Sequence, residues 1–222
     1  IPGEVGASAV QNIGAYGMEV KDVIETVDTI HTETLNERIF TNEECRYGYR
    51  KSIFKEELRG KYIITNVTFR LKKQPDYQLD YQYLREAVLQ RGEINLANIR
   101  STVISIRESK LPDPSITGNA GSFFMNPVIP KEKFEELQVS YPTMPHYPAS
   151  ETEVKVPAGW LIEQCGWKGR SVGNVGVHSR QALVIINLGG ATGPEVAGLA
   201  AQIRENVYQR FGIDITPEVN YI

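Results

Sequence analysis

The hydrophobic pattern of the chain changes at Pro75, and this change limits the folds open to it. Before Pro75, residues 20–30 and 61–72 carry runs of apolar and β-branched side chains, which are typical of strands. After Pro75, residues 76–88 open with three tyrosines and pass into a helix, and further helical patterns lie at residues 95–109, 131–139, 157–165 and 194–211. Two later strands are expected, at residues 181–188 and 213–222. The sequence therefore predicts an α+β fold.

The most clearly marked helix begins at Pro194 and ends before Gly212. Proline is favoured in the first turn of a helix, and glycine is favoured just after the last turn. The expected buried face consists of Val196, Leu199, Ile203, Val207 and Phe211. By contrast, glycine and proline crowd residues 111–127, which are expected to form an ordered loop with neither helix nor strand.

Composition and charge exclude several classes of protein. Of 222 residues, 41% are hydrophobic and 23% are charged, so the chain is expected to build a core. A formal net charge of −3 does not suit a protein that neutralises the phosphates of nucleic acid. The longest apolar stretch, residues 182–186, is far shorter than the ~20 residues of a membrane-spanning helix. Because Cys45 and Cys165 are the only cysteines, we expect a cytoplasmic protein without disulfides.

The residues that could carry chemistry form few recognisable motifs. The three histidines are isolated in the sequence and no Cys-x-x-Cys occurs, so no metal site is expected. A P-loop, a GxSxG elbow and a GxGxxG dinucleotide signature are all absent. Ser122 stands on a glycine turn before two phenylalanines, and it is either a turn-capping hydroxyl or a reactive group. The glycine-rich residues 1–17 are either a turn region or a backbone surface for a phosphate or ring.

Five segments, taken together, resemble the UDP-N-acetylenolpyruvoylglucosamine reductase (MurB) family of flavoenzymes. They are IPGEVGASAVQNIGAYG at 1–17, ECRYGYRKSIFK at 44–55, SKLPDPSITGNAGSFFMNPV at 109–128, AGWLIEQCGWKG at 158–169 and TPEVNYI at 216–222. The segments follow the order of the family and span nearly the whole chain. The resemblance also implies a missing N-terminal flavin-binding lobe, so the chain is expected to be a fragment.

The resemblance implies a domain organisation for this α+β chain. The expected parts are the C-terminal part of a two-lobed, PCMH/VAO-type FAD-binding domain at 1–75, a tyrosine-bearing insertion of the type I branch at 76–92, a complete substrate-binding domain at 93–212, and a C-terminal strand returning to the flavin side at 213–222. The family reaction uses NADPH to reduce FAD, and then reduces UDP-N-acetylglucosamine enolpyruvate to UDP-N-acetylmuramate. The fragment itself is expected to be a monomer that purifies without stoichiometric flavin. The alternative is a UDP-sugar-binding module without flavin or turnover.

The resemblance also implies roles for particular residues. Three match the catalytic positions: Arg50 for the carboxylate, Ser122 as proton donor and Glu218 in support of the enolic intermediate. The substrate contacts implied are Tyr81, Arg107, Lys110, Asn126, Tyr147 and Gln181, with Tyr77 and Tyr83 as alternatives to Tyr81. The flavin contacts implied are Pro2, Gly3, Ile13, Gly14 and Ala15. The chain departs from the family at Met125, where lysine is expected, and at Asn220, where arginine is common.

Overall fold

The computed structural model describes residues 4–81 and 83–221, and these form two compact units, Ile1–Val103 and Ile104–Ile222. The boundary between the units falls inside helix α3 (Leu96–Lys110). Each unit contains both helices and strands, which confirms the predicted α+β class. The expected flavin contacts Pro2 and Gly3 lie outside the described residues.

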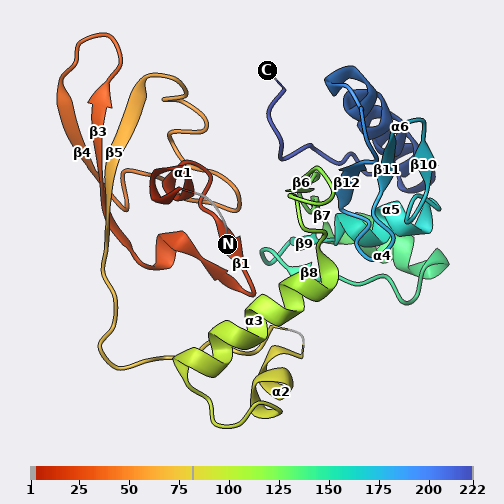
Figure 1. Ribbon diagram of the computed structural model, residues 1–222, viewed down its shortest axis with the longest axis horizontal. Helices are drawn as coiled ribbons and strands as arrows, with labels where there is room; N and C mark the ends of the chain where they lie inside the picture. Colours follow the sequence, from red (N-terminus) through yellow and green to blue (C-terminus); the bar gives the residue numbers. More distant parts are fainter. Residues whose placement is uncertain (1–3, 82, 222) are drawn as a thin grey trace. The chain divides into compact units, whose positions relative to one another are not determined.

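A three-stranded antiparallel sheet forms the centre of the first unit (Figure 1). Strand β3 (Ile24–His31) lies between β4 (Glu37–Thr41) and β5 (Tyr62–Phe69). The strands predicted at 20–30 and 61–72 are therefore confirmed in their central parts, whereas Val20–Asp22 forms a 3₁₀ turn. Phe40 of β4 packs edge-on against Phe54 and Tyr62, with ring centroids 5.1 and 5.2 Å away. These aromatic contacts close the apolar core beneath the sheet.

The glycine-rich start of the chain is more regular than its composition predicts. Val5–Val10 forms helix α1, and Gly6 within it lies against Ile64 of β5. A Cβ added to Gly6 would lie 3.7 Å from the Ile64 side chain. A tight hairpin follows, in which β1 (Gly14–Ala15) pairs with β2 (Met18–Glu19). Of the two interpretations of residues 1–17, a turn region therefore does not hold for Val5–Val10, because packing against the sheet stabilises a helical turn there.

Two helices follow the first sheet. Residues 76–88 pass into a helix as predicted, since α2 spans Leu84–Leu89. The preceding residues 76–81 have no regular structure, although Leu79 is only 2% exposed. The predicted cap of the next helix is confirmed, because the Asn95 side-chain oxygen accepts a hydrogen bond from the Asn98 backbone N–H at 2.9 Å.

A four-stranded antiparallel sheet organises the second unit. In sheet order it contains β10 (Ser171–Val172), β11 (Val175–Val177), β12 (Val184–Asn187) and β6 (Asn119–Ser122). Strand β6 contradicts the prediction that residues 111–127 form neither helix nor strand. Its polar and glycine residues have little intrinsic preference for a strand, and the ladder with β12 imposes the extended backbone. Ser122 is thereby attached to a sheet rather than to a free loop.

The remaining elements cover and extend this sheet. A second sheet contains β7 (Val128–Pro130), β9 (Glu153–Lys155) and β8 (Tyr147–Pro148), and the helices are α4 (Lys131–Ser140), α5 (Ala158–Gln164) and α6 (Gly193–Phe211). Helix α6, drawn in blue in Figure 1, packs against β11 and β12. Leu199, Ile203, Val207 and Phe211 are buried as predicted, and Val196 is half-buried.

The strand predicted at 213–222 is wrong for the described residues of that segment. After Gly212 the backbone forms only an isolated antiparallel bridge between Pro217 and Phe124. Ile213 and Ile215 are buried in the core of the second unit, on either side of the partly exposed Asp214. The segment is extended because alternate side chains are buried, not because it belongs to a long ladder.

Two glycines, one inside α6 and one directly after its last residue, are expected to affect stability in opposite directions when each is replaced by alanine. Gly212 caps the helix at φ +63°, where a Cβ is strained, so Gly212→Ala should lower the free energy of unfolding by about 1–2 kcal/mol. Gly198 lies inside the helix with no atom within 4 Å of an added Cβ. Gly198→Ala should therefore raise the free energy of unfolding by about 0.5–1 kcal/mol. Urea unfolding of both variants measures these shifts, and equal signs would contradict the assignment of Gly212 as the cap.

Candidate functional site

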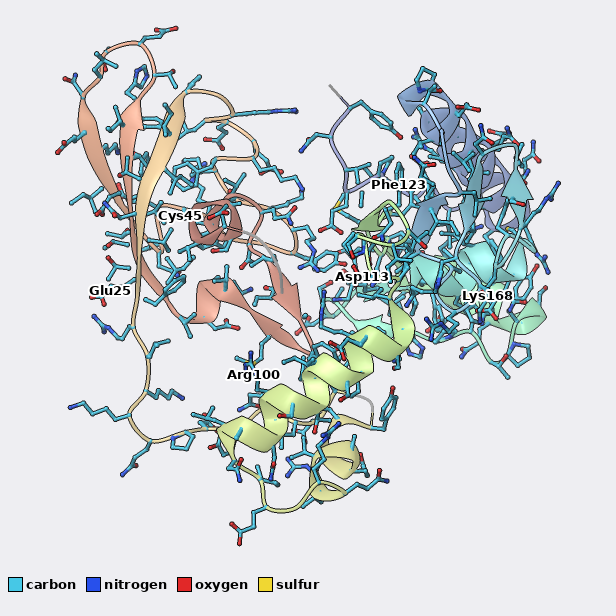
Figure 2. All side chains as sticks on the ribbon, in the orientation of Figure 1. Glu25, Cys45, Arg100, Asp113, Phe123 and Lys168 are labelled. Carbon is cyan, nitrogen blue, oxygen red and sulfur yellow. The ribbon has the colours of Figure 1, made fainter. Side chains whose placement is uncertain are left out.

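The two predicted catalytic residues of the second unit are both connected to Phe123, which Figure 2 labels: Ser122 precedes it in the chain, and Glu218 is hydrogen-bonded to its backbone. Ser122 ends β6 opposite Val184 of β12, and its side chain is exposed. The Phe123 N–H donates to the Leu183 carbonyl at 2.7 Å, and the Phe123 carbonyl accepts from the Glu218 N–H at 2.7 Å. Phe123 therefore lies between β12 and the C-terminal segment, and Ser122 and Glu218 are positioned by backbone hydrogen bonds to the same short stretch.

A second hydrogen bond fixes the register of this pairing. The Met125 N–H donates to the Thr216 carbonyl at 2.9 Å, two residues beyond the bond to Glu218 on each chain segment. Since side chains alternate between the two faces of extended backbone, a slip of one residue would turn Glu218 to the opposite face. The two bonds therefore determine which face of the segment carries the carboxylate.

Two predicted substrate-binding residues meet at the start of α5. The Asn126 side-chain oxygen accepts a hydrogen bond from the Ala158 N–H at 2.9 Å. The side-chain oxygen of Gln181 is 3.4 Å from the position that a Cβ on Gly159 would occupy. The structure thus brings Asn126 and Gln181 together, although 54 other residues separate them in the chain.

The other predicted substrate contacts of this unit come from different elements. Tyr147 lies in β8, opposite Lys155 of β9. Arg107 and Lys110 lie in the last turn of α3, where positive side chains interact favourably with the helix C-terminus. The grouping of these three side chains with Ser122 and Glu218 in one substrate site stays a prediction.

In the first unit, the structure joins Arg50 to Gly14. Arg50 Nη2 donates a hydrogen bond to the Gly14 carbonyl at 2.8 Å, and Lys55 Nζ donates one to the Arg50 carbonyl at 3.1 Å. Arg50 itself has a left-handed backbone, with φ +57°. A Cβ on Gly14 would lie 2.7 Å from the Met18 carbonyl oxygen and 3.3 Å from Arg50 Nη1. Only glycine fits here without displacing the hairpin, and Ile13 and Ala15 flank this tight point.

Asn12 is a central residue of this region that the sequence analysis did not identify. It is fully buried at φ +49°, and its side-chain nitrogen donates to Glu19 Oε2 at 3.0 Å and to the Gly48 carbonyl at 2.8 Å. Its side-chain oxygen accepts from the Lys21 N–H at 3.0 Å. The amide therefore connects the β1–β2 hairpin with the loop that leads to Arg50. The available sequence signal was the tolerance of asparagine for positive φ next to Gly14.

Tyr81 contacts the same hairpin. Its ring lies edge-on to that of Tyr16, with centroids 5.8 Å apart and an interplanar angle of 76°. Its Cβ is 3.7 Å from where a Cβ on Gly17 would lie. Of the tyrosines in the 76–92 segment, Tyr81 is therefore placed against the glycine-rich start of the chain, whereas Tyr83 is 48% exposed.

A buried thiol and phenol lie close to the Arg50 loop without being reactive groups. Burial raises the pKa of the Cys45 thiol, and it likewise raises the pKa of the Tyr47 hydroxyl. Both groups are therefore protonated at neutral pH, and Cys45 is a poor nucleophile. Cys45 belongs to the apolar core of the first unit together with Phe40 and Phe54.

The described residues also show whether this part of the chain contains a metal site or a membrane-spanning helix. No cluster of three or more His, Cys, Asp or Glu side chains with the arrangement of a metal site occurs within 4–81 and 83–221. Within the same ranges, no helix combines the length and apolarity needed to cross a membrane.

Comparisons with known proteins place this geometry in a family. Residues 113–222 match the family model described as UDP-N-acetylenolpyruvoylglucosamine reductase, C-terminal domain. Proteins named UDP-N-acetylenolpyruvoylglucosamine reductase from Porphyromonas gingivalis and Bacteroides fragilis are 56% and 52% identical to the chain. Both alignments cover 100% of the chain, and they cover 66% and 67% of the respective relatives. The chain thus spans about two thirds of the length of these curated relatives.

A solved structure supports the fold. The crystal structure of UDP-N-acetylenolpyruvylglucosamine reductase (MurB) from Thermus caldophilus matches 99% of this chain and 60% of its own, with a TM-score of 0.63 and 24% identity. This likeness shows the fold, and the identities of the curated relatives over the whole chain show the ancestry. The chain belongs to the UDP-N-acetylenolpyruvoylglucosamine reductase family.

Proposed function

We propose that the protein containing this chain is an NADPH- and FAD-dependent oxidoreductase that converts UDP-N-acetylglucosamine enolpyruvate to UDP-N-acetylmuramate. This reaction belongs to peptidoglycan precursor synthesis, and through it to cell-wall formation, cell shape and cell division. Family membership supports the proposal. The observation that carries it is the pairing through Phe123, which holds Ser122 and Glu218 on neighbouring backbone segments of one unit.

The residues of the first unit fit a flavin at the hairpin that carries Gly14. The hairpin presents the backbone of Gly14, and the cationic side chain of Arg50 donates a hydrogen bond to the Gly14 carbonyl oxygen. We assign Ile13, Gly14 and Ala15 to flavin binding, together with Pro2 and Gly3 outside the described residues. The flavin, when bound, supplies the hydride that originates from NADPH.

The chemistry required of the protein follows from the substrate. Hydride addition to the terminal vinyl carbon leaves negative charge on the adjacent carbon, which is conjugated to a carboxylate. Arg50 would bind that carboxylate with parallel hydrogen bonds and offset the developing charge. Ser122 would donate the proton that completes the reduction, and Glu218 would support the enolic intermediate. A serine alkoxide is costly to leave behind, so neighbouring donors must stabilise it.

The remaining predicted contacts are assigned to the nucleotide and sugar. Lys110 and Asn126 would contact the diphosphate, and Tyr81 would cover it. Tyr147 and Gln181 would lie along the nucleotide-sugar, with Arg107 as an additional cation. The proximity of Asn126 and Gln181 at the start of α5 supports this assignment for those two residues. We further propose a cytoplasmic monomer whose partner is this small molecule rather than nucleic acid or membrane.

The full-length enzyme tests the proposal by its two half reactions. Anaerobic NADPH should bleach the flavin absorbance near 450 nm (the ordinary absorbance of oxidised flavin), and UDP-N-acetylglucosamine enolpyruvate should restore it with formation of UDP-N-acetylmuramate. UDP-N-acetylglucosamine, which lacks the vinyl group, is the control and should restore nothing. Tight binding of the enolpyruvyl nucleotide without any reoxidation would favour the alternative, a UDP-sugar-binding module without turnover.

Tyr81→Phe should weaken substrate binding by about 0.5–1.5 kcal/mol, the net value of one hydrogen bond, with little effect on flavin reduction. The phenyl ring keeps the edge-on contact with Tyr16, so the variant removes the hydroxyl alone. Calorimetric titration with the UDP substrate measures the change, and Tyr83→Phe is the matched control. Loss of affinity in the control but not in Tyr81→Phe would assign the contact to Tyr83 instead.

A further inference from the structure

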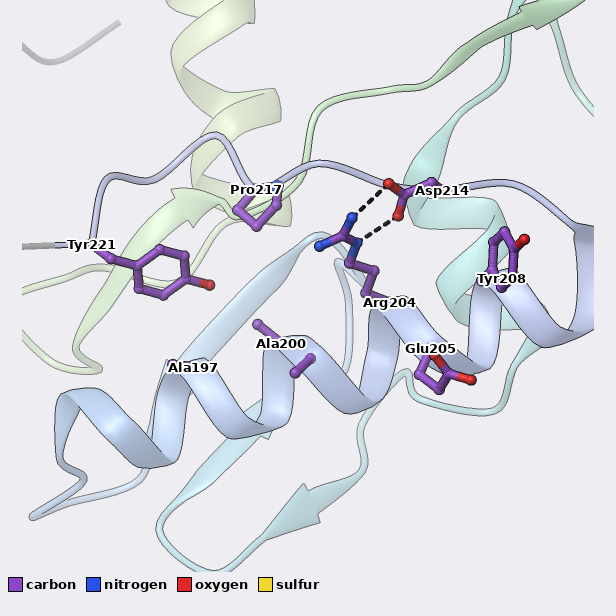
Figure 3. Close-up of a pocket in the computed structure, with 9 residues that line it drawn as sticks. Ala197, Ala200, Arg204, Glu205, Tyr208, Asp214, Pro217 and Tyr221 are labelled. Carbon is purple, nitrogen blue, oxygen red and sulfur yellow. Dashed lines mark hydrogen bonds and ion pairs between the residues drawn. The ribbon is translucent and has the colours of Figure 1, made fainter.

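The segment that carries Glu218 borders a pocket on the outer side of α6 (Figure 3). The pocket has a volume of about 520 Å³. Its α6 wall combines the small side chains of Ala197, Ala200 and Ala201 with the longer ones of Arg204, Glu205 and Tyr208, while Asp214, Pro217 and Tyr221 contribute from the C-terminal segment. Because the alanines are short, they allow the segment to run close to the helix, and they cannot hold it in place by polar contacts. A different group must anchor the segment to α6.

Arg204 and Asp214 supply that anchor, as Figure 3 shows by its two dashed lines. Arg204 Nε donates to Asp214 Oδ1 at 2.5 Å, and Arg204 Nη2 donates to Asp214 Oδ2 at 2.6 Å. A two-point contact of this kind fixes orientation as well as distance. The hydrogen bonds from Arg204 lower the pKa of Asp214, so the pair is fully charged at neutral pH.

The anchor lies on the same short segment as the bonds that position Glu218. Ile213 and Ile215, on either side of Asp214, are 2% and 0% exposed. Beyond them, the Thr216 carbonyl accepts a hydrogen bond from the Met125 N–H, and the Glu218 N–H donates one to the Phe123 carbonyl. Residues 213–218 are thus fixed by core burial on one face and by Arg204 on the other. On the outward face, the contact of Asp214 with Arg204 precedes the first of these backbone bonds, at Thr216.

We propose that Arg204 is a positioning residue for Glu218, acting through Asp214 to hold the register of residues 214–218 against Phe123. This inference rests on the proposed function, because it assumes that Glu218 takes part in reduction of the substrate. Arg204 touches no reacting atom in this scheme. Its effect passes along four residues of backbone, from the carboxylate that it holds to the Glu218 N–H.

The exposure of the pair separates this role from folding. The Arg204 and Asp214 side chains are 52% and 50% exposed, and ion pairs at such positions add little to stability. The core beneath the segment is built by Ile213 and Ile215, which a change at Arg204 leaves intact. The Arg204→Gln variant should therefore fold and retain its urea unfolding midpoint closely, while small displacements of catalytic groups can cost up to about 10²-fold in rate.

Single-turnover kinetics of the full-length enzyme test the proposal. Arg204→Gln should slow oxidation of the NADPH-reduced enzyme by UDP-N-acetylglucosamine enolpyruvate by about 10-fold to 100-fold. The rate of reduction by NADPH and the dissociation constant of the substrate should stay near their original values. Asp214→Asn should give the same loss, and the double variant should lose no more than either single one, since both remove one contact. Arg204→Lys should recover part of the rate.

Matched variants distinguish positioning from a general effect of removing a charge. Arg70 of the first unit makes a comparable two-point pair, with Nη2 2.5 Å from Glu25 Oε1 and Nε 3.2 Å from Glu25 Oε2. The control variant Arg70→Gln breaks this pair and should leave both half reactions unchanged.

A second comparison uses the Glu218→Gln variant as the background. In that background, Arg204→Gln should cause no further loss of rate. If Glu218→Gln slows the reaction but Arg204→Gln does not, the positioning role is wrong and the proposed function stands. If Glu218→Gln itself has no effect, the proposed role of Glu218 is wrong, and with it the basis of the inference.

Discussion

Replacing Ser122 by alanine is expected to slow oxidation of the reduced full-length enzyme by its enolpyruvyl substrate about 10²–10⁴-fold, the usual contribution of a positioned acid. Ser122 is exposed at the end of β6, and its backbone is held between β12 and the C-terminal segment through Phe123. Alanine keeps this backbone pairing and removes only the hydroxyl. Since the proton is needed after hydride addition, reduction of the enzyme by NADPH should keep its rate.

Stopped-flow measurement of the two half reactions checks this result. Ser171→Ala is the matched control, because Ser171 is an exposed serine in β10, the opposite edge strand of the same sheet. The control should leave both rates unchanged. Reoxidation of Ser122→Ala at the parental rate would show that another group donates the proton, and a loss of NADPH oxidation in the same variant would point to a broader disturbance of the enzyme.

Gly14→Ala is expected to produce the second large effect, by displacing Arg50. The added Cβ would lie 2.7 Å from the Met18 carbonyl oxygen, which is backbone and cannot rotate away, so the β1–β2 hairpin must open. Overpacking of this kind costs about 1–3 kcal/mol in the free energy of unfolding. Because Arg50 donates to the Gly14 carbonyl, its guanidinium should move with the hairpin, and reduction of the substrate should slow by up to about 10²-fold.

Urea unfolding and single-turnover kinetics report the two parts of this prediction separately. Gly6→Ala is the control, since its Cβ would meet Ile64 at an ordinary 3.7 Å in the same unit and far along the chain from Arg50. That variant should not lower the free energy of unfolding, because alanine is favoured over glycine inside a helix, and it should leave substrate reduction unchanged. A Gly14→Ala variant with unchanged substrate reduction would contradict the assignment of Arg50 to the carboxylate, or its dependence on the hairpin.

Local sequence signals were sufficient for the long helices α3 and α6. Helix α6 was predicted with its buried face and its Gly212 cap because periodicity and end signals all lie within the element. The same holds for the Asn95 cap of α3. Arg50, Ser122 and Glu218 were selected by resemblance, and the structure adds the backbone contacts that hold each of them.

Features that depend on distant partners were not predictable from local pattern. Strand β6 has the composition of a turn, and it becomes a strand only because β12 offers a partner. The 213–222 segment is the opposite case: a strand was predicted there, but its described residues form an isolated bridge to Phe124, and Ile213 and Ile215 are buried in the core. Asn12 is buried, and its three hydrogen-bond partners come from other positions in the chain, so its tolerance for positive φ was the one local signal and did not reveal those partners.

The position of β6 at the edge of its sheet has a consequence for the order of folding. Strands β10, β11 and β12 follow one another in sequence and can pair locally, whereas β6 must wait for a partner that lies much further along the chain. Contacts between distant residues form slowly, because the entropy of closing a long loop is lost first. We expect a compact species with its helices formed and β6 still undocked. In refolding, recovery of catalytic activity should therefore lag behind recovery of the far-ultraviolet helical signal.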